Sequence, residues 1–115
     1  MYVVMRSDLV KSHKWNVGGL ISNGAHACMA VVMAHRNDPD VERYTSPDAE
    51  TQMHKVVLAA KDEGELVETS KMLERHGMAH KVWVEQPEMI RSCLAVKPYP
   101  RSIIQPLLKA LKLFR

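Results

Sequence analysis

Three side chains in this 115-residue sequence have types and positions suited to acid–base chemistry. Asp8 follows an apolar run at residues 2–6, and Glu85 ends a second apolar run, HKVWVE. His26 stands between them in a stretch of small residues. A carboxylate near a histidine orients the ring or raises its pKa, so such a group could activate water. Taken singly, His26 also fits a satisfied core histidine and Glu85 a solvated strand end.

The stretch around His26, GGLISNGAHACMA, could also bind phosphate. A helix N-terminus exposes N–H groups and the positive end of its dipole, so Gly18 and Gly19 suit an anion. The dinucleotide fingerprint G-x-G-x-x-G is absent, however, because the glycines stand at 18, 19 and 24. No acid ends the later run HKVVLAA to hold a ribose. We therefore expect no nucleotide cofactor, and no other cofactor is indicated.

Neither a metal centre nor a covalent nucleophile is supported by the spacing. His76 and His80 are four residues apart, but Gly77 should end the helix between them, and no HExxH or paired CxxC occurs. Cys28 and Cys93 lie in apolar runs, which raise the pKa of a thiol and make it inert. We expect no metal site, and two free thiols in a reducing, cytoplasmic compartment.

The charge distribution and the hydropathy of the chain limit the classes of partner that it could bind. The net charge is +3, and residues 89–115 hold six basic side chains and no acidic one. That surface could face a polyanion or could be an ordinary solvated face. No apolar run approaches 18 residues on inspection, so no membrane span is expected, and the N-terminus lacks a signal-peptide layout.

These side chains would be positioned by alternating strands and helices. The hydrophobic pattern predicts strands at 2–6, 54–60, 80–85 and 91–97, and helices at 18–36, 46–54, 62–77 and 102–112, with connections at 10–15 and 37–45. The order β-α-α-β-α-β-β-α predicts α/β: a single-domain three-layer α/β/α fold over residues 1–115, with a four-stranded mixed sheet and helices on both faces. The short link between the last two strands predicts an antiparallel pair.

Several motifs in this order resemble a known family. Residues 5–9 (MRSDL) and 23–27 (NGAHA) are similar to an R-x-D-L and an A-A-Q-x-(S/A)-H-A signature. Residues 92–98 (SCLAVKP) resemble a late strand T-V-L-A-(I/V)-G-P, and residues 111–113 a C-terminal L-K-L. Together they resemble the peptidyl-tRNA hydrolase type 2 family over nearly the whole chain. EQPE and KPYP resemble its eukaryotic peptidyl-tRNA hydrolase domain-containing branch.

The resemblance implies hydrolysis of the ester between a peptide and tRNA, with peptidyl-tRNA as the partner. Water must be activated, the developing oxyanion stabilised and tRNA phosphates contacted. The implied catalytic residues are Asp8, His26 and Glu85. The implied substrate-binding residues are Arg6, Lys11, Lys14, Gly18, Gly19, Asn23, Ser92 and Lys97. Family members often pair, and the Met-rich helix could serve a homodimer interface.

Three departures leave other functions open. The family lysine in the glycine turn is replaced by Gly19, and the family glutamine by Asn23. The family stretch D-x-G-x-T falls at EQPEM, where Glu85 keeps the carboxylate and the hydroxyl is lost. Lys11 and Lys14 could replace the missing lysine, and backbone N–H groups of the glycine turn could meet phosphate. The alternatives are a non-catalytic tRNA-, RNA- or protein-binding module and a hydrolase of other small esters or amides.

Overall fold

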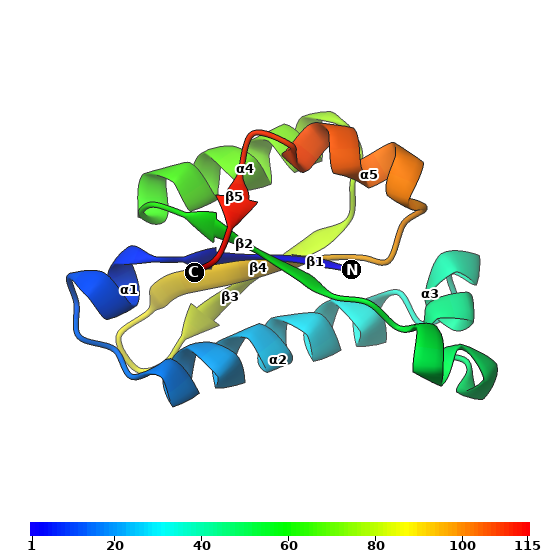
Figure 1. Cartoon of the computed structure of the whole chain (residues 1–115), viewed down its shortest axis with the longest axis horizontal. Helices are drawn as coiled ribbons and strands as arrows, with labels where there is room; N and C mark the ends of the chain where they lie inside the picture. Colours follow the sequence, from blue (N-terminus) through cyan, green and yellow to red (C-terminus); the bar gives the residue numbers. More distant parts are fainter.

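A twisted mixed sheet organises the computed structural model, which describes residues 1–115 (Figure 1). Its strand order is β3-β4-β1-β2-β5. The strands are β1 (Tyr2–Arg6), β2 (Val56–Ala60), β3 (His80–Glu85), β4 (Ile90–Val96) and β5 (Lys112–Leu113). β1 and β2 are parallel, and the other neighbouring pairs are antiparallel, including β3 with β4 as predicted.

Helices lie on both faces of this sheet, which confirms the three-layer α/β/α expectation (Figure 1). The α-helices are α1 (Asp8–Lys11), α2 (Val17–Ala34), α3 (Pro39–Tyr44), α4 (Glu63–Arg75) and α5 (Arg101–Leu108), and a 3₁₀ helix η1 covers Pro47–Gln52. α2 packs on one face, and α4 and α5 pack on the other (Figure 1). The sheet therefore has a separate hydrophobic core on each of its faces.

The alternation of β1 explains the two cores. Val3 and Met5 join the core beneath α2, whereas Val4 joins the core beneath α4 and α5. Successive side chains of a strand point to opposite faces, so one apolar run supplies both layers. Full burial of a Val or Leu side chain stabilises the fold by about 1.5–3 kcal/mol.

α2 owes its place to composition rather than to strong amphipathicity. Its inner side buries Leu20, Asn23, Ala27 and Val31. The helix holds 18 residues and no Asp, Glu, Lys or Arg, and by length and composition alone it could cross a membrane. Our expectation that no apolar run approaches 18 residues was therefore wrong. In this fold α2 is a core helix whose inner side packs on the sheet.

Local capping signals located α4 correctly and could have located α3. Asp62 caps α4 by accepting from the backbone N–H of Glu65 at 2.9 Å, and Gly77 follows its end at φ 69°. Asp38 likewise caps α3, where residues 37–45 were expected to be a connection. Pro39 at the first helical position was a start signal of the same kind as Ser46-Pro47, which begins η1.

Other differences lie at short elements. Part of the expected connection at 10–15 belongs to the single-turn helix α1. The last helix ends at Leu108 rather than near Lys112, and this frees β5 to pair with β2 at Leu58↔Leu113. The sheet therefore has five strands rather than four. A two-residue strand has no periodicity of its own, so only the proximity of β2 creates it.

Candidate active site

The side-chain amide of Asn23 links helix α2 to the ends of two strands. Its Nδ2 donates to Glu85 Oε2 at 3.0 Å and to the carbonyl of Gly19 at 2.7 Å. Its Oδ1 accepts from Ser92 Oγ at 2.6 Å. Asn23 and Ser92 are 1% and 0% exposed, so these bonds form away from water. Because every polar atom of the amide is used, the Glu85 carboxylate is held in one orientation.

A β-bulge brings Ser92 to this cluster. The pairing of β3 with β4 shifts register between Trp83, which faces Cys93, and Val84, which faces Arg91. The extra residue is Ser92. Regular alternation would place Ser92 and Cys93 on opposite faces, but here Cys93 lies in the core beneath α2 and Ser92 also reaches α2. The bulge thus supplies the hydroxyl that fixes the Asn23 amide.

Glu85 borders a hollow of about 480 Å³. Lys14, Trp15, Asn16, Gly19, Glu85, Gln86, Glu88 and Ile90 line it. Glu85 Oε1 accepts from the backbone N–H of Gln86 at 3.2 Å. Lys14 adopts φ 58°, in the left-handed region that a lysine seldom occupies. The carboxylates of Glu85 and Glu88 and the ammonium group of Lys14 therefore line the same open space beside the start of α2.

The N-terminus of α2 presents free donors at Val17 and Gly18. Asn16 caps the helix, and its Oδ1 accepts from the Gly19 N–H at 2.6 Å. The expectation that Gly19 meets phosphate through its N–H is therefore wrong, because the cap already occupies that donor. The N–H groups of Val17 and Gly18 have no acceptor in the fold and remain suited to an anion.

His26 lies about one turn beyond Asn23 on α2 and is held by different partners. Its ring stacks on Trp83 with centroids 4.8 Å apart and planes at 22°. Its Nε2 is 3.3 Å from Ser22 Oγ. The ring is exposed and hydrogen bonds to neither predicted carboxylate, Asp8 or Glu85. The structure thus stacks His26 on Trp83 and does not place it in a carboxylate–histidine pair.

Asp8 belongs to a separate ion-pair cluster. Arg6 Nε donates to Asp8 Oδ1 at 3.0 Å and Nη2 donates to Oδ2 at 2.8 Å. This bidentate contact holds the pKa of Asp8 below its usual range and raises the pKa of Arg6. Arg6 also donates to the carbonyl of Arg91 at 3.0 Å and lies 3.5 Å from Glu63. Asp8 follows β1, and Glu85 is the last residue of β3. β4 lies between these two strands, so β1 and β3 are about 10 Å apart across the sheet.

Two predicted substrate-binding lysines lie elsewhere. Lys97 is 4% exposed, 3.1 Å from Asp38 and 3.9 Å from the Tyr99 ring centroid. It directly follows β4, at the opposite end of the β3–β4 pair from Glu85, so it acts as a structural cation there rather than as part of this site. Lys11 lines a different, apolar groove. Lys97, which the resemblance implied as a substrate-binding residue, lies away from Glu85 because β4 runs antiparallel to β1 and β3.

Comparison with known proteins decides the family. A family model described as "Peptidyl-tRNA hydrolase PTH2" matches residues 1–114. The proteins named "Putative peptidyl-tRNA hydrolase PTRHD1" in Mus musculus and Homo sapiens are each 36% identical over 115 residues, which cover 99% of this chain and 81% of theirs. The chain belongs to the PTH2 family. The similarity to PTRHD1 also supports the resemblance to the eukaryotic branch.

Within this PTH2 chain, two side chains near the predicted site were missed. Trp83 carries the stack on His26, and its spacing of two from Glu85 on a strand was a usable signal. His13 lies with Nε2 3.4 Å from Asp8 Oδ2, and no pattern in the sequence indicated that contact.

Both cysteine thiols are free, as the sequence predicted. The fold brings no cluster of metal ligands together. Cys28 and Cys93 are free, and burial raises the pKa of both, that of Cys93 to about 12. A thiol with a raised pKa stays protonated, and because the thiolate is the reactive form, such a thiol is unreactive. No group of three or more His, Cys, Asp or Glu side chains could hold a metal ion.

Proposed function

We propose that this PTH2 protein hydrolyses the ester of peptidyl-tRNA with Glu85 as the general base. The orientation of Glu85 by Asn23, at 3.0 Å, carries the proposal. A buried amide fixes the carboxylate, while the carboxylate itself borders the hollow. A base held in this way can take a proton from a water as that water attacks the ester carbonyl.

The remaining groups suit the charges of that reaction. Attack on the ester places negative charge on the carbonyl oxygen, which the free N–H groups of Val17 and Gly18 could stabilise. Lys14 lines the same hollow and offers an ammonium group to the tRNA phosphate nearest the ester. Asp8 would act indirectly, by holding Arg6 and the start of α1.

The test is release of peptide from a purified peptidyl-tRNA. We expect turnover by the wild-type chain and salt-sensitive tRNA binding. Asp8→Asn and His26→Ala should retain more activity than Glu85→Gln, because neither side chain contacts the oriented carboxylate. Equal loss in all three variants would contradict the assignment of Glu85 as the base.

A second candidate is a tRNA-binding module without catalysis. The observation that favours it is Gly19. This glycine lines the hollow at the position where the family signature carries a lysine. A Cβ at Gly19 would lie 3.3 Å from Asn16 Oδ1, so a small adjustment of the cap would admit a side chain there. Salt-sensitive tRNA binding with no turnover, and turnover that appears in Gly19→Lys, would support this candidate.

We further propose a cytoplasmic setting for this activity. Both cysteines are free, and one is completely buried, as expected for a protein of a reducing compartment. Localisation of the tagged full-length protein by microscopy is the direct test.

A further inference from the structure

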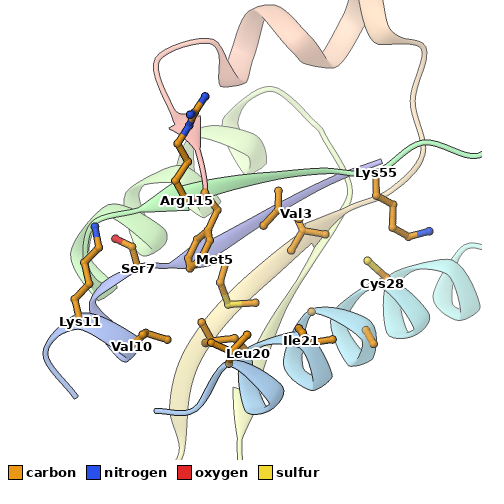
Figure 2. Close-up of a pocket in the computed structure, with 15 residues that line it drawn as sticks. Val3, Met5, Ser7, Val10, Lys11, Leu20, Ile21, Cys28, Lys55 and Arg115 are labelled. Atoms are coloured by element: carbon orange, nitrogen blue, oxygen red, sulfur yellow. The ribbon is translucent and has the colours of Figure 1, made fainter. Parts of the chain in front are cut away.

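A second, larger groove, distinct from the Glu85 hollow, runs beside α2 (Figure 2). It has a volume of about 700 Å³ and shares no lining residue with that hollow. Its walls come from α2, from β1 and β2, and from the last residues of the chain (Figure 2). Apolar side chains predominate, among them Val3, Met5, Leu20, Ile21, Val57 and Phe114. Such a groove suits an apolar occupant.

The side of α2 that borders this groove is apolar and exposed. Val17 and Ile21 are 62% and 68% exposed. They lie four residues apart, so they share one side of the helix, whereas Met29 and Met33 are turned away from the groove and do not line it. The groove-lining positions of α2, from Val17 to Cys28, span about 17 Å at 1.5 Å per residue.

The charged residues that line the groove are all basic. Lys11 and Lys55 stand toward opposite ends, and Arg115 stands beside β5 (Figure 2). None of the three forms an ion pair within the chain, although Lys55 Nζ is 3.3 Å from the hydroxyl of Tyr44. An occupant with an apolar face and negative charges toward both of its ends would complement this arrangement.

We propose that the groove docks an amphipathic helix of a partner protein, with acidic residues toward both ends of the apolar face of that helix. A helix in a groove is anchored by apolar residues at i, i+3, i+4 and i+7, and a length near 17 Å corresponds to about three helical turns. Methionine side chains adapt to varied partners, which suits Met5 in the groove wall.

Other occupants match these features less well. A second copy of this chain would offer its own α2, which has no acidic residue, and would bring two basic rims together. A single-chain amphiphile would fill the groove, but its one charged group would leave the other basic side chains among Lys11, Lys55 and Arg115 without a counter-charge. A membrane surface would not enter a concave groove. The helix satisfies the concavity, the length and the charge at once.

Binding of synthetic helical peptides tests the proposal. The probe is a labelled 18-residue peptide with leucines at i, i+3, i+4 and i+7 and glutamates toward both ends, measured by fluorescence anisotropy at two salt concentrations. We expect it to bind the full chain at least about tenfold more tightly than the same peptide with lysines toward its ends, a difference of about 1.4 kcal/mol.

Variants of the groove sharpen the test. Ile21→Gln with Val57→Gln should weaken binding about tenfold or more, whereas Ile103→Gln, 48% exposed on α5, should not. Lys55→Glu with Arg115→Glu should reverse the preference for acidic ends, and Lys109→Glu should not. Unchanged circular dichroism and Tm would show that each variant is folded.

Several results would overturn the proposal. They are no binding of either peptide, equal binding of both, self-association that depends on Ile21 and Val57, and binding of oleate or of anionic phosphatidylcholine–phosphatidylserine vesicles without binding of peptide. Hydrolysis of peptidyl-tRNA should be unaffected by Ile21→Gln with Val57→Gln. Docking at the groove and catalysis at Glu85 can therefore fail independently.

Discussion

Asn23 on α2 donates to Glu85 at the end of β3 across 62 residues of sequence, and the same amide accepts from Ser92 on β4. One buried side chain thus ties the helix to two strands and orients the carboxylate that borders the hollow. Neither Asp8 nor His26 takes part in this network. The chemistry that we propose therefore centres on the Asn23–Glu85 contact.

Glu85→Gln should abolish most turnover while leaving tRNA binding intact. The amide keeps the size of the side chain but cannot accept a proton from water, so we expect a rate loss of about 10²–10⁴-fold. Single-turnover release of peptide from peptidyl-tRNA measures the rate, and filter binding measures the affinity. Glu88→Gln is the matched control, because Glu88 lines the same hollow and forms no hydrogen bond or ion pair. Comparable rate loss in both variants would point to general electrostatics rather than to a specific base.

Asn23→Ala should lower both stability and turnover. The change removes bonds to Gly19, Glu85 and Ser92 and leaves buried groups unpaired, which costs about 1–3 kcal/mol. Urea unfolding measures that loss. We expect kcat to fall more than KM rises, because the carboxylate loses its orientation and not its charge. Met33→Ala, at an exposed position on the same helix, serves as control; a change confined to KM would contradict a positioning role for Asn23.

The Arg6–Asp8 pair should make stability depend on pH at the acid end. The folded-state pKa of Asp8 is lowered by its hydrogen bonds to Arg6. The pair therefore contributes its full stability above the ordinary carboxyl pKa of about 3.9, and this is lost as pH falls through the lower folded value. Asp8→Asn should be destabilised by about 1–3 kcal/mol near pH 6, a difference that shrinks below about pH 4. Urea titrations across this range check it; a gap that does not narrow in acid would exclude this origin.

Lys97→Met should destabilise the fold without weakening tRNA binding. The Lys97 ammonium group is nearly buried and compensates Asp38 and Asp40. Its removal leaves Asp38 without a cationic partner, whereas Asp40 keeps Arg43. Loss of one member of a buried pair costs about 3–5 kcal/mol, and less here because the two aspartates are partly exposed. Thermal unfolding and tRNA titration below the Tm separate the two effects. Lys81→Met, on an exposed strand position, is the control; tRNA affinity lost in Lys97→Met alone would return this lysine to the binding surface.

Local signals were sufficient for most of the framework. The apolar run HKVWVE predicted β3 to the residue, and Asp62 and Gly77 predicted the limits of α4. These features depend on neighbours within a few positions, through alternation and capping, so the sequence alone carries them. The family followed from short motifs in order, and the match over residues 1–114 bears that out.

The assembly of the site required the tertiary structure. The positions of Asp8, His26 and Glu85 near strand ends in the sequence suggested that the three would meet. In the sheet, however, β4 lies between β1, which precedes Asp8, and β3, which ends at Glu85. The bulge at Ser92 and the burial of Lys97 also depend on how strands pair, which is a long-range property. The residue types that could do chemistry are written in the sequence. Which of them share one hollow is decided by strand order, register and the faces to which side chains point.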